Sequence, residues 1–218
     1  MSLRINSLAP DFTAQTSDGP VSFHDWLDGN YAILFSHPRD FTPVCTTEFG
    51  AVARLAPEWE KRNTKVIGIS VDSADDHQKW KADIAAVGGA PANFAIIDDT
   101  SLTVAKLYQM LPEDATIPEE GSTPANTATV RSVFIIGQDK KIRLTMVYPM
   151  SVGRNFAEIL RALDAVQKTD GVPLATPANW NPGEDVIVST ALDDAAAEAR
   201  YGALTKPLPY LRYAKDPA

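Results

Sequence analysis

The sequence predicts an α/β fold, with a mixed, mostly parallel central sheet flanked by helices and a small C-terminal extension. Apolar runs of strand length alternate with helical patterns in the order strand, helix, strand, helix, strand, helix, strand, strand, helix. Most of these runs are apolar at consecutive positions, which is typical of strands buried on both faces. Beyond residue 169 this alternation ends and prolines become frequent, which indicates a different kind of segment.

The expected strands are short runs separated by helical or polar segments. The first, Tyr31 to Phe35, leads directly into the only cysteine-containing stretch of the chain. The last, 142–146, alternates apolar and polar residues and follows a predicted hairpin turn, so we expect it to be half-exposed. The remaining runs are 65–71, 94–97 and 133–136.

The expected helices follow the strands in turn. One begins at Pro43, and Pro57 should kink or restart it. The next begins at Ser73, a favourable N-cap residue, and ends at Gly88-Gly89. A short helical pattern covers 101–110, and a longer one covers 155–168. The proline-rich segment 112–126 should be an exposed loop.

The chain is expected to form a main domain, 1–168, and a C-terminal extension, 169–218. The extension holds two short apolar pieces and an aromatic end with Tyr210 and Tyr213. The extension has too few apolar residues to form an independent hydrophobic core. We therefore expect the extension to pack on the main domain or on a partner subunit.

The net charge, the length of the apolar runs and the cysteine count each argue against particular classes of function. The 218 residues carry a net charge of −8, which argues against binding of a nucleic-acid backbone. No apolar run approaches the length of a membrane span, and the first residues lack a signal-peptide core. A single cysteine excludes an intramolecular disulfide and favours a reducing compartment, so we expect the protein to be cytoplasmic.

The lone cysteine lies at a helix start. If Thr42 is the N-cap, Pro43 takes the first helical position, where a missing N–H costs nothing. Cys45 is then in the first turn, near unpaired N–H groups that favour the thiolate, and the Thr42 hydroxyl could accept from the Cys45 N–H or turn toward the sulfur. The plainer interpretation is a small buried hydrophobic residue, but the polar flanking residues favour a nucleophile.

Other candidate side chains have structural interpretations. The three histidines show no metal-ligand spacing, and His77, between polar residues of a helix, is expected on a solvated face. His37 can be an ordinary loop histidine. The spacing alone would favour a surface ion-pair residue for Arg131. Trp59 and Trp80 are expected in the core.

The segment around the cysteine resembles the active-site signature of the peroxiredoxins. The pattern Pro38-x-x-x-Thr42-x-x-Cys45 carries the resemblance, and the string from Phe35 to Glu48 is similar to the one-cysteine subgroup. Similar stretches recur along nearly the whole chain, to Tyr210-Leu211-Arg212-Tyr213. The resemblance implies a thioredoxin-like fold, hydroperoxide reduction without metal, haem or other cofactor, and a homodimer, possibly extended to a higher oligomer, in which the C-terminal part contacts the partner.

The resemblance also implies roles for individual residues. Cys45 matches the peroxidatic cysteine, Thr42 the hydroxyl that hydrogen-bonds thiolate and peroxide, and Pro38 the residue that shields the sulfur from water. Arg131 matches the arginine that completes the site from a neighbouring strand. The supporting residues are Glu48 and Arg154, which orient that arginine, and His37, which the subgroup places near the sulfur.

One departure concerns a second activity of some one-cysteine relatives, a phospholipase with a serine nucleophile. The corresponding position here is Asn30, so we expect no such activity. His24 and Asp139 match the other two positions of that triad and are then structural.

The expected reaction forms a sulfenic acid at Cys45. Because the chain has no second cysteine, an external reductant such as glutathione, a glutaredoxin, thioredoxin or ascorbate must clear it. Two alternatives stay open at this point. One is a cysteine hydrolase that uses Cys45 and His37, and the other is a redox sensor or chaperone that acts through Cys45.

Overall fold

The computed structural model describes residues 3–116 and 127–217, so part of the predicted loop 112–126 lies outside the described residues. The chain forms two compact units, Met1–Phe156 and Ala157–Ala218. This division falls before the long helix near residue 160, whereas the sequence suggested a boundary after it. No helix in the described part of the chain has the length and apolar character needed to cross a membrane.

A five-stranded sheet forms the centre of the first unit, in the order β5-β4-β3-β6-β7. Its strands are β3 (Tyr31–Ser36), β4 (Thr64–Ser70), β5 (Ala95–Asp98), β6 (Arg131–Ile136) and β7 (Ile142–Tyr148). β3 pairs in parallel with β4, and β4 with β5, but β6 is antiparallel to both β3 and β7. The mixed sheet is confirmed, although only half of its strand pairs are parallel.

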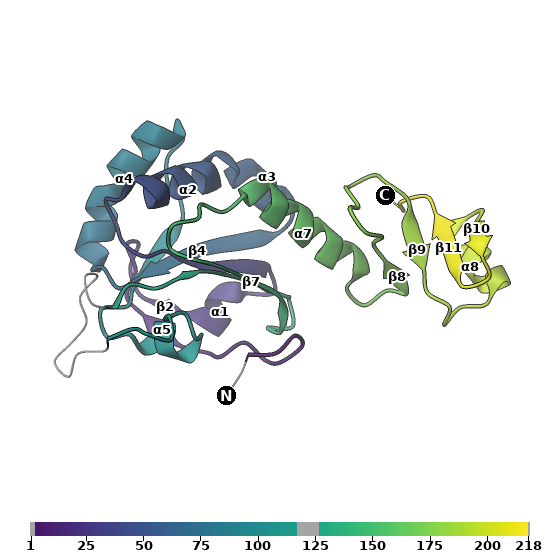
Figure 1. The fold of residues 1–218 in the computed structure, drawn as a ribbon, viewed down its shortest axis with the longest axis horizontal. Coiled ribbons are helices and arrows are strands. Elements are labelled where there is room, and N and C mark those ends of the chain that lie inside the picture. The colour runs from purple at the N-terminus through teal and green to yellow at the C-terminus, as the bar shows by residue number, and fades with distance from the viewer. Residues whose placement is uncertain (1–2, 117–126, 218) are drawn as a thin grey trace. The chain divides into compact units, whose positions relative to one another are not determined.

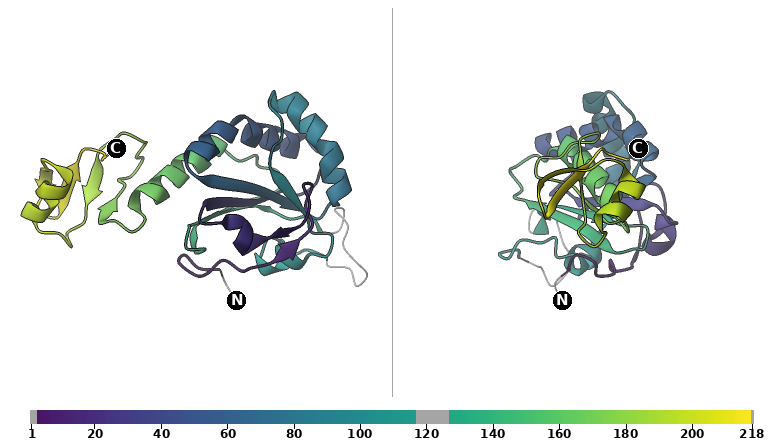
Figure 2. Two further views of the ribbon diagram at one scale, coloured as in Figure 1. Left: turned by 180° about the vertical axis from the view of Figure 1, so that it is seen from behind. Right: turned by 90° about the vertical axis from the view of Figure 1, so that its right-hand side faces the viewer.

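Helices cover both faces of this sheet (Figures 1 and 2). On one side are α2 (Pro43–Arg54), α3 (Ala56–Lys61) and α4 (Ala74–Gly88), and on the other α1 (Phe23–Leu27) and α5 (Thr103–Leu107). α5 is shorter than the predicted helix 101–110. A small hairpin of β1 (Thr13–Ala14) and β2 (Val21–Ser22) precedes α1. Ser73 caps α4 by accepting the N–H of Asp76, and Gly89 ends that helix in a left-handed conformation, as predicted.

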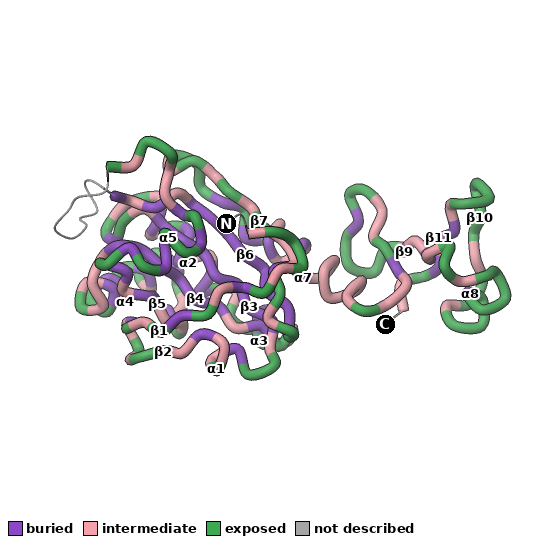
Figure 3. Tube along the Cα trace, turned by 90° about the horizontal axis from the view of Figure 1, so that it is seen from below, coloured by how far each residue is buried: buried purple, intermediate pink, exposed green. Residues whose placement is uncertain are grey.

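Burial explains why these residues form these elements. Every residue of β3 and of β6 is buried, as the continuous apolar runs predicted (Figure 3). β7, an edge strand of this sheet, alternates between exposed and half-buried residues over its second half, and Val147 is 63% exposed. α2 and α4 cross at two glycines, where a Cβ on Gly50 would lie 2.9 Å from the Gly88 Cα. This close crossing fixes α4 against the helix that carries Cys45.

The second unit is a small α/β arrangement of its own. Its four-stranded sheet has the order β10-β11-β9-β8, and every pair is antiparallel. Its buried residues include Trp180, Val186 and Ala214. The bounds are α7 (Phe156–Thr169), β8 (Leu174–Ala175), β9 (Val186–Val188), α8 (Asp194–Tyr201), β10 (Thr205–Leu208) and β11 (Leu211–Ala214). The predicted packing of this segment on the main domain or on a partner stays a prediction.

Candidate active site

Cys45 lies just beyond the carboxyl end of the central strand β3, in the first turn of α2. Thr42 is the N-cap and Pro43 the first helical residue, as the sequence predicted. The capping bond that the sequence suggested is absent, and the Thr42 hydroxyl donates to the Arg39 carbonyl at 2.9 Å. The backbone N–H groups in the first turn of α2 therefore donate no hydrogen bond to the N-cap side chain. Cys45 itself is fully buried.

Arg131 reaches the sulfur from the start of β6, the strand beside β3. Its Nη1 lies 3.4 Å from Cys45 Sγ and 2.7 Å from Glu48 Oε2, and its Nε donates to the Met150 carbonyl at 2.8 Å. The side chain is 3% exposed. Both ends of the guanidinium are thus fixed, and one of its N–H groups points at the sulfur. The surface ion pair that spacing alone suggested for Arg131 is not what the structure shows.

Glu48 joins Arg131 to a second buried arginine. Its Oε1 accepts the Arg154 N–H at 2.7 Å and Nε at 3.0 Å, while its Oε2 accepts Arg154 Nη2 at 2.7 Å. Burial would raise the pKa of Glu48, but the hydrogen bonds and charge of Arg154, with Arg131, hold that pKa below its ordinary value. The cluster therefore has two cations and one carboxylate, and an anionic sulfur on Cys45 would neutralise the remaining buried charge.

His37 and Pro38 occupy the loop between β3 and α2. Pro38 is half-buried. The His37 ring is fully buried, stacks on Trp80 at 5.1 Å between centroids, and meets the edge of Phe49 at 4.5 Å. Its Nε2 is bonded to Asp40, and its Nδ1 has no hydrogen-bond partner among the described residues. The structure thus brings Arg131, Glu48 and Arg154 to Cys45 but ties the His37 ring to Asp40.

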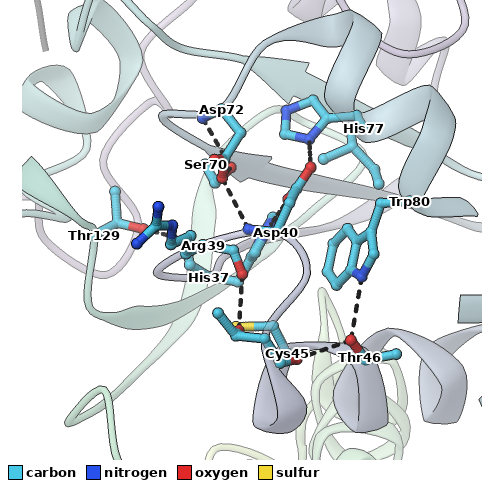
Figure 4. A network of polar contacts seen from close by, with 12 residues as sticks. His37, Arg39, Asp40, Cys45, Thr46, Ser70, Asp72, His77, Trp80 and Thr129 are labelled. Atoms are coloured by element: carbon cyan, nitrogen blue, oxygen red, sulfur yellow. Dashed lines mark hydrogen bonds and ion pairs between the residues drawn. The ribbon is translucent and has the colours of Figure 1, made fainter. Parts of the chain in front are cut away.

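A second buried cluster connects this loop to α4, and it corrects the prediction for His77. This residue is fully buried rather than solvated, with Nδ1 2.6 Å from Asp40 Oδ2 and Nε2 3.0 Å from the Ile97 carbonyl oxygen (Figure 4). The other Asp40 oxygen lies 2.6 Å from His37 Nε2. Burial would raise the pKa of Asp40, but its hydrogen bonds to both histidines keep that pKa low.

The hydrogen positions in this cluster follow from its partners. The carbonyl of Ile97 can only accept, so the hydrogen of that bond lies on His77 Nε2. The low pKa of Asp40 keeps it ionised, so His37 Nε2 donates to Asp40 Oδ1. Burial lowers the pKa of His37 despite the nearby carboxylate. His37 is therefore a neutral imidazole with its hydrogen on Nε2.

This cluster also bears on metal binding. His37, Asp40 and His77 each offer a ligand atom within 4.8 Å of the others, although their sequence spacing gave no sign of it. The nitrogen–oxygen distances of 2.6 Å are hydrogen-bond distances, whereas two ligands bound tetrahedrally to one zinc ion at ~2.0–2.1 Å lie more than ~3 Å apart. In the folded chain, His37 and His77 each form a hydrogen bond with a different oxygen of Asp40.

Comparison with known proteins decides the family. A family model described as the AhpC/TSA family matches residues 5–145, and one described as the C-terminal domain of 1-Cys peroxiredoxin matches residues 162–203. The chain belongs to the 1-Cys peroxiredoxins. It is accordingly an enzyme, a thiol-dependent peroxidase with a single peroxidatic cysteine, and the predicted thioredoxin-like fold is confirmed.

Relatives match this peroxiredoxin over nearly its whole length. It is 46% identical over 215 residues to the mitochondrial peroxiredoxin PRX1 of Saccharomyces cerevisiae, covering 98% of this chain and 81% of that protein. It is 46% identical over 225 residues to peroxiredoxin-6 of Rattus norvegicus, covering 99% and 98%. Among solved structures, a cysteine-to-serine variant of peroxiredoxin 6 from Arenicola marina superimposes with a TM-score of 0.90 at 38% identity, covering 99% of both chains. The yeast mitochondrial 1-Cys peroxiredoxin gives 0.86 at 45%, covering 98% and 99%.

The residues that match the phospholipase triad of some peroxiredoxins make other contacts here. Asn30 stands at the nucleophile position, and its side-chain amide donates to the carbonyls of Leu27 and Asp28. His24 Nε2 lies 2.8 Å from the Ala9 carbonyl oxygen. Asp139 forms ion pairs with two neighbouring cations. These contacts favour structural roles.

Sequence reasoning missed Asp40 and misplaced His77. A signal for His77 was available, because it precedes Trp80 by three residues and Ile84 by seven, which places all three on one helical face. Trp80 is buried, as predicted, and so is Trp59. Nothing in the local pattern pointed to Asp40, since it meets His77 only through the folded sheet.

Proposed function

We propose that this peroxiredoxin reduces hydrogen peroxide and organic hydroperoxides at Cys45 and is returned to the thiol by an external reductant. The observation that carries the proposal is the 3.4 Å contact between Arg131 Nη1 and Cys45 Sγ inside a buried charged cluster. A guanidinium has a planar fork of donors, so it can contact a thiolate and a peroxide oxygen together. A lysine ammonium offers no such fork.

The first half-reaction is a displacement at oxygen. The Cys45 thiolate attacks one peroxide oxygen, a sulfur–oxygen bond forms, and the oxygen–oxygen bond breaks. Hydroxide or alkoxide leaves and takes a proton, and donors already aimed at that oxygen lower the barrier. We assign this role to Arg131, with the Thr42 hydroxyl as a second donor once it rotates away from the Arg39 carbonyl. Pro38 shields the sulfur from water.

The supporting residues act through Arg131. Glu48 accepts hydrogen bonds from both arginines, and Arg154 is itself held by the Ser132 carbonyl at 3.0 Å. We propose that these two residues keep the guanidinium in place, and that His37 shapes the loop before Cys45. The proposed chemistry uses no metal or organic cofactor, because the attacking thiolate and the stabilising cation are both side chains.

The second half-reaction consumes two thiols. One thiol attacks the sulfenic acid, which gives a mixed disulfide at Cys45 and water, and a second thiol releases the enzyme thiol and a free disulfide. Both thiols are external because the chain has one cysteine. We propose glutathione, with a glutaredoxin or thioredoxin, as the reductant. The yeast relative, whose thiol is described as resolved through glutathione and thioredoxin systems, supports this choice.

We further propose a cytoplasmic homodimer in which the C-terminal unit contacts the partner. A single cysteine, which cannot form an intramolecular disulfide, suits the cytoplasm, and a mitochondrial relative shows that another compartment also suits the family. The edge strand β7 exposes Val147, and the C-terminal unit exposes Leu208 and Tyr210. Apolar side chains on an open edge and on a small unit are suited to a protein partner.

Peroxide turnover with each reductant in parallel tests the proposal. We expect rapid loss of hydrogen peroxide, sustained by glutathione alone or with glutaredoxin or thioredoxin, and a sulfenic acid at Cys45 by mass spectrometry. The control is Cys45→Ser, which leaves the chain without any thiol. Sustained turnover in that variant would refute the proposed nucleophile. Slow oxidation with capture of a protein on Cys45 would instead support a redox sensor.

A further inference from the structure

The loop between β3 and α2 carries an arginine that the proposed peroxide chemistry does not use. Arg39 is exposed, and its guanidinium has no ion pair or hydrogen bond with any residue that the structure describes. Its backbone carbonyl accepts the Thr42 hydroxyl at 2.9 Å. A cation without a partner, six residues before Cys45, is available to an anionic group of a ligand.

The backbone on both sides of Arg39 is held in place. On one side, the Thr129 hydroxyl donates to the His37 carbonyl at 2.7 Å. On the other, the Asp40 N–H donates to Asp72 Oδ2 at 2.9 Å (Figure 4). Arg39 therefore presents its charge from an ordered loop, so a ligand does not have to order that loop when it binds.

A cavity of about 420 Å³ lies beside Arg39. Its wall combines this cation with carboxylates from the loop after β4 and from α4. The lining residues are Arg39, Asp40, Phe41, Thr42, Asp72 and Asp76. Because Thr42 is the N-cap of α2, a molecule in this cavity lies against the start of the helix that carries Cys45.

The carboxylates of this cavity are not equally available to a ligand. Asp40 is buried and bonded to two histidines, and Asp72 uses one oxygen for the Asp40 N–H. Asp76 accepts the Ser73 hydroxyl at 2.9 Å with one oxygen, while its other oxygen lies 3.5 Å from the exposed Lys79 ammonium. The Asp76 side chain is 49% exposed. The cavity thus offers a cation at Arg39 and an accessible carboxylate at Asp76.

An α-amino acid group matches this pair of charges. It carries an ammonium and a carboxylate on one carbon atom, which suit the Asp76 carboxylate and the Arg39 guanidinium respectively. A guanidinium binds a carboxylate through two parallel N–H donors, which fixes the orientation of the ligand as well as its position. Of the proposed reductants, glutathione carries such a group at its γ-glutamyl end, whereas a simple alkyl thiol does not.

We propose that Arg39 and Asp76 form a recruitment site for the α-amino acid end of glutathione and hold this thiol against the start of α2. The proposal rests on the proposed function for the identity of the reductant. The bound thiol attacks the sulfur of the Cys45 sulfenic acid, a sulfur–sulfur bond forms, and the sulfur–oxygen bond breaks. The hydroxide leaves with the thiol proton as water. Arg39 and Asp76 determine which thiol is favoured, because they bind its non-reacting end.

Charge reversal tests the cationic half of the site. Arg39→Glu is compared with the control Arg4→Glu, which changes the net charge by the same amount. Arg4 is also exposed, and it lies near Asn6, whose N–H donates to the Ile142 carbonyl beside the hairpin at the end of β6 that is remote from Arg131. Reduction of the sulfenic acid is followed by stopped flow with glutathione, with the cation cysteamine and with neutral 2-mercaptoethanol.

The thiol preference should invert at Arg39 alone. Relative to the 2-mercaptoethanol rate, we expect Arg39→Glu to lower the glutathione rate by roughly 3- to 10-fold and to raise the cysteamine rate. Arg4→Glu should leave both ratios unchanged. An unchanged glutathione ratio in Arg39→Glu, or an equal change in the two variants, would overturn the recruitment site.

Asp76→Asn tests the anionic half. The amide keeps an acceptor for the Ser73 hydroxyl and removes the charge. We expect the glutathione rate to fall by roughly 2- to 5-fold, and the rate with 3-mercaptopropionate, which has a carboxylate but no ammonium, not to fall. The control is Asp75→Asn, an exposed acid in the same first turn of α4 that does not line the cavity. Equal losses in both variants would contradict a contact with the ammonium.

A titration without any redox step separates the site from the reductant. S-methylglutathione, which has no thiol, is added to the Cys45→Ser variant, and the Arg39 Nε–H signal is followed by NMR. We expect a saturable shift that Asp76→Asn weakens and Asp75→Asn does not. If glutathione failed to reduce the unaltered sulfenic acid, the proposed reductant would be wrong, and this titration alone would decide on the site. No shift at Arg39 would overturn it.

Discussion

Replacing Glu48 by glutamine would remove the one carboxylate that two buried arginines share at the reactive sulfur. Glu48 accepts a bond from Arg131 Nη1 and three from the backbone and guanidinium of Arg154. A glutamine has one acceptor oxygen, and its amide N–H groups would face guanidinium donors. We therefore expect Glu48→Gln to leave arginine donors unpaired and two buried cations without their carboxylate.

The size of the effect follows from burial. The Glu48 side chain is 2% exposed and those of Arg131 and Arg154 are 3% and 0% exposed, so water cannot replace the lost bonds. Breaking a buried ion pair costs about 3–5 kcal/mol of folding free energy. A guanidinium displaced by an ångström should also slow the reaction of Cys45 with peroxide by about 10²-fold.

Urea unfolding and stopped-flow oxidation measure the two effects. The matched control is Glu58→Gln, because Glu58 also pairs with two cations, Lys61 at 2.7 Å and Arg62 at 2.8 Å, but at the surface. Solvent screens that pair, so we expect a much smaller loss of stability and an unchanged peroxide rate. If Glu48→Gln behaved like the surface control, the buried cluster would not be what organises the site.

Other predictions address the cation, the helix crossing and acid stability. Arg131→Lys should slow peroxide oxidation by about 10²–10³-fold in stopped-flow measurements, whereas the surface change Arg161→Lys should leave it unaltered. Gly50→Ala should cost about 1–3 kcal/mol in urea unfolding, because its new Cβ meets backbone atoms of the facing glycine on α4; unchanged stability would contradict the close crossing. The pKa values of Asp40 and His37 are both lowered in the folded chain, so both groups stabilise it above their ordinary pKa values and lose that contribution on acidification. Below pH 6.5 the free energy of unfolding should fall by up to about 1.4 kcal/mol per pH unit for His37, and a flat profile in urea titrations would refute this.

The fold could be predicted from periodicity, but the strand directions only in part. The run from Tyr31 to Phe35 and the helix from Pro43 follow from apolar pattern and capping chemistry, and both form as predicted. The direction of β6 depends on where the chain returns to the sheet after the long connection that precedes it. No local pattern encodes that, so the expected share of parallel pairs was too high.

The candidate site was likewise predictable only in part from the local sequence. Local chemistry placed Cys45 in a first helical turn, but Arg131 looked like a surface residue until the resemblance to a family was considered. The reason is physical, since Arg131 reaches the sulfur only because β6 lies beside β3. His77 was misjudged from its polar neighbours, although its spacing from Trp80 placed it on the buried face of α4.

The most direct test of the central claim is single-turnover oxidation of Cys45 followed by addition of glutathione. We expect one equivalent of hydrogen peroxide to convert Cys45 to a sulfenic acid, and glutathione then to give a mixed disulfide at that residue before the thiol returns. Cys45→Ser should show neither step. Peroxide loss without any change of mass at Cys45 would show that Cys45 is not the peroxide-reducing nucleophile.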